Sequence, residues 1–568
     1  MISINRIRLL SLFAFIVAAL IVTRLFYVQI IHGSEYSESA DRQYAVPSAN
    51  VFDRGTISFQ ERGGNLIAAA TLQSGYFLAI NPKEIKDATT TWEGISSVIL
   101  LDRDSFMAKA GKKDDPYEEV ARRISKENAD KLNSLKLSGV SLYKEKWRFY
   151  PAGPLAAHVL GFVAYKGDNL TGRYGLESYY NDVLGRQGSN LYVNFFAEVF
   201  ANLKDSLFTE ADKREGDLVT TIDPAIQNAL ESELLAVEDK YNSKITGGII
   251  INPKDGSIYA MAKVPTFDLN RFQEVKDVSV FNNQMVEGNY EMGSIVKALT
   301  IAAALDAGAI TSKTTYNDTG SLTLSGRTIY NFDKKGRGVV DMQQVLDESL
   351  NTGAVFVMQK LGHEQFKNYF LAYGFGEKTG IDLPGEGRNL ISNLDTNRDI
   401  EYATAAFGQG IAITPITAAR AFSVIANGGY LITPHIAQRI DYKTGLSSVI
   451  SYPKGRQALK PATSEEITRM LVKVVDKALL GGTVKMQNYS IAAKTGTSQL
   501  GKEDGSGYYD DRFRHSFFGY FPAYNPTFLI FLFTEDPRGE IYASHTLTAP
   551  FMNLTKFLIN YYELPPDR

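Results

Sequence analysis

The sequence predicts an α+β protein of several domains that begins with a transmembrane helix. Its 568 residues suit two to four domains at roughly 150 residues each. Hydrophobic residues make up 44% of the chain and charged residues 22%, a composition typical of folded domains and not of disordered or fibrous chains. Strand-like and helix-like patterns are mixed along the chain, and one long apolar segment lies close to residue 1.

The apolar segment covers residues 7–31. About 20 apolar residues span the roughly 30 Å hydrocarbon core of a bilayer. Arg6 and Arg8 precede its charge-free stretch at 9–23, which by the positive-inside rule places the N-terminus in the cytoplasm. A cleavable signal peptide has a similar start, but bulky residues follow here in place of a small-residue cleavage site. We therefore predict a cytoplasmic stub and a single-pass anchor in the cytoplasmic (inner) membrane over residues 1–33, with the remaining chain extracytoplasmic.

The first predicted domain beyond the anchor covers residues 34–210. Apolar and polar residues alternate over 45–80 with Gly-rich breaks, which predicts strands and a hairpin. Residues 84–135 are charge-rich and have a helical period, including the run PYEEVARRISKENADKLNSL. A Gly- and Tyr-rich stretch over 148–188 predicts mixed structure. We expect this domain to be α+β and elongated.

The second predicted domain covers residues 211–568. It opens with TTIDPAIQNALESELLAVEDKY, which has the pattern of an amphipathic helix. Two strands follow in GGIIINPKDGSIYAMA, around a turn at Lys254–Gly256. Strands and helices then mix as far as Phe557 without a linker-like stretch. We expect an antiparallel sheet flanked by helices.

Composition also excludes several kinds of function. The chain has no cysteine, which excludes disulfides, Cys-ligated zinc, iron–sulfur clusters and a cysteine nucleophile. Six scattered histidines without an H-E-x-x-H motif argue against a His-rich metal site, and a P-loop motif is absent from the sequence. The net charge of −3 argues against a dedicated nucleic-acid binder.

A Ser-x-x-Lys motif is the first candidate for catalysis. Serine and lysine three residues apart on a helix lie on the same face, so the amine can serve as the base for the hydroxyl. The motif occurs three times, but the copy at Ser141 lies in a β-like run and the copy at Ser451 contains a proline. Ser294 and Lys297 instead begin an almost wholly apolar helix, ALTIAAALDAG. Burial there disfavours the ammonium form and lowers the pKa of Lys297.

Two more motifs follow along the chain. Ser349 and Asn351 lie between the amphipathic helices MQQVLDE and TGAVFVMQKLG. Lys-Thr-Gly occurs at Lys378, at Lys443 and at Lys494, and context again separates the copies. The first two fall in a loop and a hairpin turn, whereas the last follows the apolar YSIAA and precedes SFFGYFPA and FLIFLF. It is therefore predicted on an edge strand, where an extended peptide can pair and a lysine can bind a carboxylate.

Each motif alone is weak, but the ordered set is that of penicillin-binding proteins and class A β-lactamases. The chain resembles a class B penicillin-binding protein, most like the division-type (FtsI-like) peptidoglycan D,D-transpeptidases. The resemblance covers nearly the whole chain, including the segments YPAGPLAAHVLGFV, GRYGLESYYNDVLGRQG, GFGEKTGIDLPGE and GQGIAITPITAARAFSVIANGG. It implies a pedestal of the dimerisation type followed by a penicillin-binding/β-lactamase-like transpeptidase domain.

The resemblance also implies roles for the motif residues. Ser294 would be the nucleophile that forms an ester with the penultimate D-Ala of a peptidoglycan stem peptide, or with a β-lactam. Lys297 would take the proton of Ser294, and Ser349 would pass it to the leaving D-Ala. Asn351 would hold the substrate backbone. An amine of a neighbouring stem peptide would then resolve the acyl-enzyme and leave a cross-link.

The third motif would bind the end of the substrate. By the same resemblance, Lys494 and Thr495 would hold the terminal carboxylate, and Gly496 and Thr497 would continue the substrate-binding strand. The backbone N–H groups of Ser294 and Thr497 would form the oxyanion hole. The resemblance implies no metal or organic cofactor. It implies a membrane partner of the SEDS family of glycan polymerases, with other proteins of the divisome.

The chain departs from the family pattern near the serine, where Met292 stands in place of a common proline and Ile295 in place of a common threonine. These departures bear on β-lactam affinity more than on the chemistry. Arg54 and Gly55 match the start of the pedestal signature, and we interpret them as a tight turn with a surface charge.

Four alternatives stay open at this point. A bifunctional class A enzyme would need a glycosyltransferase domain. A D,D-carboxypeptidase or anchored β-lactamase would need a base that activates water. A non-catalytic scaffold of the wall-synthesis complex would need no catalytic residues. A transpeptidase could also serve cell elongation in place of cell division.

Overall fold

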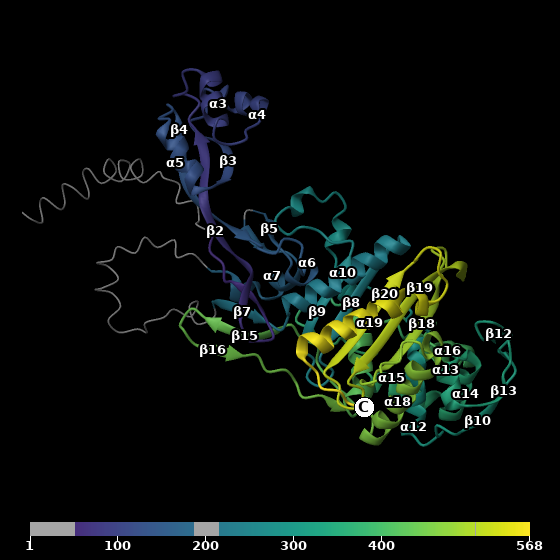
Figure 1. Ribbon diagram of the computed structural model, residues 1–568. Helices are drawn as coiled ribbons and strands as arrows, with labels where there is room; N and C mark the ends of the chain where they lie inside the picture. The colour runs from purple at the N-terminus through teal and green to yellow at the C-terminus, as the bar shows by residue number, and fades with distance from the viewer. Residues whose placement is uncertain (1–51, 168, 187–214, 506) are drawn as a thin grey trace, which may run out of the picture. The chain divides into compact units, whose positions relative to one another are not determined.

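The computed structural model describes residues 52–167, 169–186, 215–505 and 507–568, which form two units (Figure 1). The predicted anchor at 7–31 lies outside the described residues. Within those residues, no helix has the length and apolar character needed to cross a bilayer. The described parts of the smaller unit are residues 52–53 and Ser74–Trp147, and the larger unit comprises Arg54–Gln73, Arg148–Arg186 and the described part of Lys204–Arg568.

The smaller unit packs three helices against a short sheet. The second half of β2 pairs with β3 and β4, and their inward side chains meet those of the helices in a core that includes Leu78, Ile95 and Phe106. Each helix begins at an N-cap side chain, Asp87, Asp102 or Ser125, that accepts a backbone N–H of the first turn. The elements are β2 (Leu66–Ile80), α3 (Ala88–Ser96), α4 (Arg103–Ala110), β3 (Glu118–Ile124), α5 (Lys126–Ser134) and β4 (Val140–Phe149).

One sequence prediction in this unit is wrong. The run PYEEVARRIS was predicted as helix, but Glu118–Ile124 forms strand β3. It pairs antiparallel with β2, with Tyr76 opposite Ile124 and Ile80 opposite Glu118, and Ile124 enters the core. Sheet pairing and burial outweigh the weak helical propensity of a charged segment. The helix expected after it, α5, is present.

In the larger unit, a sheet joins segments that are far apart in the chain. Strand β1 pairs antiparallel with the first half of β2, which confirms the predicted hairpin, and parallel with β7. Strand β7 pairs with β15, and β15 with β16. The sheet therefore joins residues on both sides of position 210. The additional strands are β1 (Ile57–Gln60), β7 (Gly216–Thr220), β15 (Ala437–Tyr442) and β16 (Ser447–Val449).

Arg54 lies beside this sheet and is not a surface charge as we had interpreted it. It is 3% exposed, and its Nε lies 2.5 Å from Oε2 of Glu177, which is fully buried. Arg148 approaches the other oxygen of Glu177 at 2.5 Å. Gly55 is needed because a Cβ there would lie 2.1 Å from the carbonyl oxygen of Gly216 on β7. The structural role of Arg54 and Gly55 is thus a buried ion cluster with close backbone packing.

The second sheet of the larger unit is five-stranded and antiparallel, in the order β18-β19-β20-β8-β9 (Figure 1). Strands β8 and β9 form the predicted hairpin, and β18 is the predicted edge strand. Runs of buried apolar residues account for the central strands, since both faces are covered. The strands are β8 (Ile245–Ile251), β9 (Ile258–Val264), β18 (Ala492–Gly501), β19 (Tyr508–Phe521) and β20 (Phe528–Glu535).

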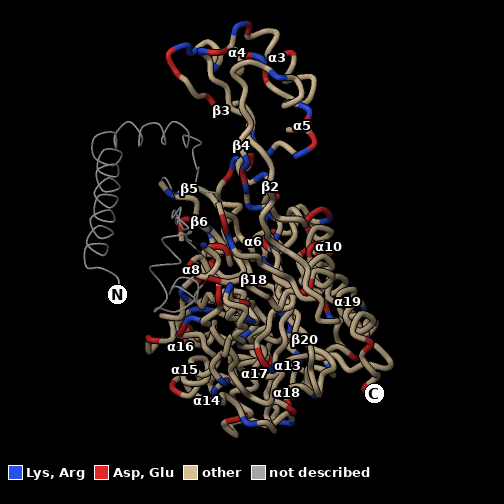
Figure 2. Tube along the Cα trace, turned by 90° about the vertical axis from the view of Figure 1, so that its left-hand side faces the viewer, with Lys and Arg blue, Asp and Glu red and all other residues tan. Residues whose placement is uncertain are grey.

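Helices cover both faces of this sheet. The predicted helix α10 (Pro224–Tyr241) starts at the N-cap Asp223 and packs beside α19 (Ala543–Tyr562) in one core. Helices α12 (Val296–Asp306), α17 (Pro415–Ala426) and α18 (Pro461–Lys473) belong to the core on the other side. Phe422 of α17 stacks on Phe518 of β19 with centroids 3.9 Å apart. Basic and acidic residues are interspersed along the described trace (Figure 2).

The remaining elements of the larger unit are short helices and hairpins. They are α6 (Ala157–Leu160), β5 (Val163–Lys166), β6 (Asn169–Gly172), α7 (Gly175–Tyr179), α8 (Asn181–Leu184), α11 (Gln284–Glu287), β10 (Thr315–Asp318), β11 (Ser321–Leu324), β12 (Arg327–Tyr330), β13 (Gly338–Asp341), α13 (Met342–Asp347), α14 (Asn351–Leu361), α15 (His363–Ala372), α16 (Asp399–Ala405), β14 (Tyr430–Leu431) and β17 (Arg456–Gln457). The predicted domain limits at 33 and 210 stay predictions.

Candidate active site

Ser294 lies in a single 3₁₀ turn, Gly293–Ile295, that leads directly into α12. Lys297 is the second residue of that helix, so the serine and the lysine are one turn apart, as their spacing predicts. The helix is buried along nearly its whole length, which confirms the expectation from ALTIAAALDAG. Gly293 has a φ of +62°. A side chain at Gly293 would be strained in that conformation and would meet the carbonyl oxygen of Thr497.

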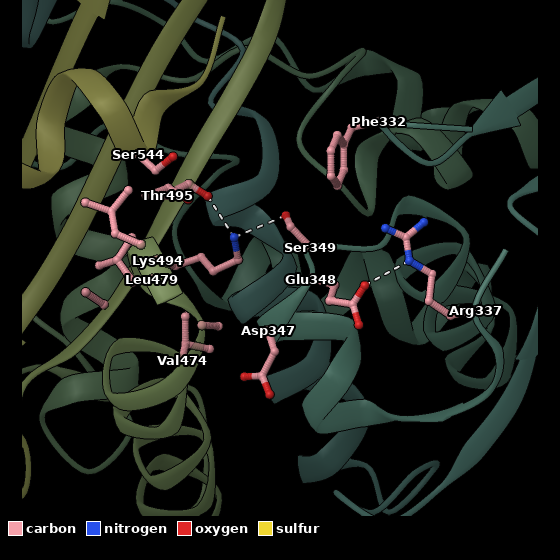
Figure 3. A pocket seen from close by; sticks show the side chains of 13 residues that line it. Phe332, Arg337, Asp347, Glu348, Ser349, Val474, Leu479, Lys494, Thr495 and Ser544 are labelled. Atoms are coloured by element: carbon pink, nitrogen blue, oxygen red, sulfur yellow. Dashed lines mark hydrogen bonds and ion pairs between the residues drawn. The ribbon is translucent and has the colours of Figure 1, made fainter. Parts of the chain in front are cut away.

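Three motif side chains meet at the hydroxyl of Ser349. Lys297 donates from Nζ to Oγ of Ser349 at 3.2 Å and to its carbonyl oxygen at 2.5 Å. Lys494 reaches the same Oγ from the strand side at 3.1 Å and also donates to the carbonyl oxygen of Thr495 at 2.9 Å. Figure 3 shows the Lys494 amine between Ser349 and Thr495. The three motifs therefore converge, although they are far apart in the chain.

Both amines are buried. Lys297 is fully buried, and Lys494 is 3% exposed. Burial, reinforced by the nearby Lys494, lowers the pKa of Lys297 well below its ordinary value. Burial also lowers the pKa of Lys494 to about 8, against the opposing effect of the Asp347 carboxylate. These directions favour the neutral amine at Lys297, which can accept a proton, beside an amine at Lys494 that is cationic below a pKa of about 8.

One side of the site is formed by the junction between helices α13 and α14. Both helices lie where the sequence predicts them, and Ser349 occupies the junction with a φ of 54°. This left-handed conformation is uncommon for serine and turns the chain sharply between the two helices. Asn351, the first residue of α14, donates from Nδ2 to the carbonyl oxygen of Tyr330 at 2.8 Å. That contact orients its amide.

The opposite side of the site is formed by strand β18, which carries Lys494, Thr495, Gly496 and Thr497. A Cβ at Gly496 would lie 2.7 Å from the carbonyl oxygen of Met292 and 2.9 Å from the N of Ile295. The absence of a side chain therefore lets β18 lie directly against the turn that holds Ser294. From the neighbouring strand, Ser516 donates to the same carbonyl oxygen of Met292 at 2.6 Å. The Gly293–Ile295 turn therefore contacts two strands of the sheet, β18 and β19.

A cavity of about 240 Å³ adjoins these groups. Ser349, Lys494 and Thr495 line it, whereas Ser294, Lys297 and Asn351 do not. Sequence reasoning missed ten further lining residues, among them the four labelled near Ser349 in Figure 3, Phe332, Arg337, Asp347 and Glu348. Arg337 pairs with Glu348 at 2.8 Å. Their proximity to Ser349 in the chain is the only signal for Asp347 and Glu348, and it says nothing of where the side chains point.

The other motif copies occupy unrelated places. The Ser141 copy lies on strand β4, and the Lys443 copy forms the turn of the β15–β16 hairpin, as predicted from its context. The Ser451 copy follows β16 in irregular structure. Among the described residues, no cluster of three or more His, Asp or Glu side chains could hold a metal ion.

Comparisons with known proteins identify the family of both parts of the chain. Residues 246–555 match the family described as penicillin binding protein transpeptidase domain, and residues 51–200 match the penicillin-binding protein dimerisation domain. Stage V sporulation protein D of Bacillus subtilis is 32% identical over 96% of this chain and 84% of its own length. Peptidoglycan D,D-transpeptidase FtsI of Buchnera aphidicola is 25% identical over 97% of this chain and 94% of its own.

Solved structures show the same fold. Penicillin binding protein 2X from Streptococcus thermophilus superposes with a TM-score of 0.73 at 18% identity, over 91% of this chain and 81% of that one. Penicillin binding protein 3 from Mycobacterium tuberculosis, complexed with aztreonam, gives a TM-score of 0.68 at 21% identity, over 91% and 98%.

The fold and the site therefore define a penicillin-binding protein, and the chain belongs to the class B members of that family. Its enzymatic activity is that of a serine-type D-Ala-D-Ala transpeptidase.

Proposed function

We propose that Ser294 is the nucleophile of this transpeptidase and that Lys297 is its base. The convergence of Lys297, Ser349 and Lys494 within hydrogen-bond distance is the observation that supports the proposal. Oγ of Ser294 attacks the carbonyl carbon of the penultimate D-Ala of a stem peptide, and its proton passes to Nζ of Lys297. The proton then reaches the leaving amine of the terminal D-Ala through Ser349. The peptide bond breaks as the ester forms.

The remaining motif residues bind and polarise the donor peptide. Lys494, which is cationic below its pKa of about 8, and Thr495 bind the terminal carboxylate. Asn351 holds the donor backbone. The N–H groups of Ser294 and Thr497 stabilise the oxyanion, and loss of one such donor typically lowers the rate by about 10²–10³-fold. A β-lactam enters the same site and stays bound as a stable acyl-enzyme.

Acylation by a fluorescent penicillin tests this assignment. The full chain in detergent, run on a denaturing gel, should carry a covalent band that is lost in Ser294→Ala. A band that persists in Ser294→Ala would refute the nucleophile. Incubation with stem peptides then separates the reactions, since a transpeptidase yields a cross-linked dimer and a D,D-carboxypeptidase releases D-Ala alone.

The setting of the enzyme is also a proposal. The charge-free stretch 9–23 within residues 7–31, after Arg6 and Arg8, supports a single-pass anchor with the catalytic unit outside the cytoplasmic membrane. The resemblance to division-type relatives supports a role in septal wall synthesis with a SEDS-family polymerase. Extraction of membranes with alkaline carbonate should leave the protein in the pellet. Co-purification with the polymerase in detergent should be lost when residues 7–31 are replaced by an unrelated anchor.

A further inference from the structure

Glu291 lies three residues before the proposed nucleophile and joins two distant segments. Its Oε1 accepts a hydrogen bond from the backbone N–H of Gly410 at 2.8 Å and another from the hydroxyl of Tyr508 at 2.9 Å. Burial raises the pKa of Glu291 although both hydrogen bonds oppose the rise. The proposed reaction uses no atom of this carboxyl group. A partly buried carboxyl group in this position therefore needs another explanation.

The backbone of Glu291 is tied to strand β18. Oγ of Ser498 donates to the carbonyl oxygen of Glu291 at 3.0 Å. Ser498 directly follows Thr497, whose N–H is one of the two proposed oxyanion donors. A shift of Glu291 would therefore act on the strand next to that donor.

The segment that Glu291 contacts through Gly410 also packs against Gly293, the residue before the second donor. The N–H of Gly293 donates to the carbonyl oxygen of Gly408 at 3.1 Å. A Cβ at Gly408 would lie only 2.3 Å from the carbonyl oxygen of Gly293, so the two backbones are in direct contact. Gly293 precedes Ser294, whose N–H is the second proposed donor. The loop Gly408–Gly410 thus fixes one side of the turn, and Glu291 fixes the loop.

We propose that Glu291 is a positioning residue for the oxyanion hole, holding the Ser294 turn, the Gly408–Gly410 loop and the start of β19 in one arrangement. The proposal rests on the proposed function, because it takes Ser294 as the nucleophile. Oxyanion donors act on charge that develops in the transition state. A misplacement near 1 Å can slow a reaction by about 10²-fold. Loss of Glu291 should therefore slow acylation without weakening the noncovalent complex.

Saturation kinetics of acylation by a fluorescent penicillin separate these two quantities. We would compare the full chain in detergent with Glu291→Ala, Glu291→Gln and Tyr508→Phe. Glu291→Ala should lower the limiting acylation rate constant by about 10- to 100-fold, with the dissociation constant of the noncovalent complex unchanged. Glu291→Gln should keep most of the rate, because the amide oxygen can accept both hydrogen bonds. Tyr508→Phe, which removes one of the two, should fall between them.

Three results would overturn the proposal. They are a wild-type rate constant in Glu291→Ala, a loss in Glu291→Gln as large as in Glu291→Ala, and a loss that appears in the dissociation constant. If the thermal melt shows that Glu291→Ala does not fold, the acylation rate constant of Tyr508→Phe tests the proposal instead. This variant removes a single hydroxyl near the surface and should therefore fold. Ser294→Ala is run in parallel. A band in that variant refutes the proposed function, whereas unslowed Glu291 variants beside a Ser294-dependent band refute only this inference.

Discussion

Two groups of buried cations in the larger unit contrast with each other. Arg54 and Arg148 share the carboxylate of Glu177, and all three side chains are almost fully buried. Lys297 and Lys494 are equally buried, but within the described part of the chain neither forms an ion pair. Their hydrogen-bond partners are hydroxyl and carbonyl oxygens. In the first group, the carboxylate offsets the cost of burying the two guanidinium groups. The amines of the second group lose a proton more readily, because burial, the main influence on both, lowers their pKa values.

The contrast separates structural from chemical use of a buried cation. A compensated pair contributes cohesion and is strongly destabilising to break, since one partner is left as an isolated buried charge. Burial of an amine without a counter-charge disfavours its ionised form, so the neutral form that can act as a base becomes more accessible. Four experiments test this difference between the two groups of cations.

Removal of the uncompensated amine at Lys297 should have the largest effect. Lys297→Ala should slow acylation by a fluorescent penicillin by about 10²–10⁴-fold, the usual contribution of general base catalysis. The fold should be retained, because no ionic partner is stranded. Lys144→Ala is the matched control. Lys144 belongs to another Ser-x-x-Lys motif, on β4, so this variant should be acylated at the wild-type rate. Undiminished acylation of Lys297→Ala would contradict the role of base.

Removal of the compensating carboxylate at Glu177 should destabilise the folded protein. Glu177→Gln leaves two buried guanidinium groups without a counter-charge and should lower the free energy of unfolding by about 3–5 kcal/mol. Urea or thermal unfolding measures the change. Glu274→Gln is the control, because its pair with Arg271 is exposed and should leave the midpoint in place. A midpoint for Glu177→Gln equal to that of the control would refute the compensated cluster.

The pKa of Lys494 predicts a smaller, pH-dependent effect on binding. Its ammonium group loses its proton as pH rises through about 8, so affinity for a carboxylate-bearing penicillin should decline above that pH. In Lys494→Arg the charge persists to far higher pH, and the decline should disappear. The noncovalent dissociation constant, measured from about pH 6 to about pH 10, gives the result. An identical decline in Lys494→Arg would assign it to another group.

The smallest effect is expected from Asp347. Its carboxylate raises the pKa of Lys494 against the larger lowering by burial. Asp347→Asn should therefore move the decline in affinity to lower pH, by about one unit or less. The same titration measures it, with the plateau affinity at low pH as internal control. A shift to higher pH would mean that Asp347 does not act on Lys494 through its charge.

Prediction from sequence succeeded where a local pattern and its tertiary surroundings agree. Ser294 and Lys297 are one turn apart on a helix whose apolar residues require burial, so their relation follows from spacing alone. The strands around Lys494 are long apolar runs that only a covered sheet can accommodate. Strand β3 was missed because its charged residues fit a helix locally, and only pairing with β2 makes them a strand. Arg54 was misplaced because a single arginine carries no sign of a distant carboxylate.

The class of chemistry could be predicted from the sequence alone, which contains three ordered motifs, the apolar helix next to the serine and the apolar strand next to the last lysine. Their roles, and the interpretation of the segment 7–31, rest on the resemblance and on composition. The tertiary structure decided which motif atoms meet. Lys297 is 52 residues from Ser349 and Lys494 is 145 residues from it, yet both amines reach one hydroxyl. Burial that lowers the pKa of an amine is a property of the packed surroundings, which no local pattern contains.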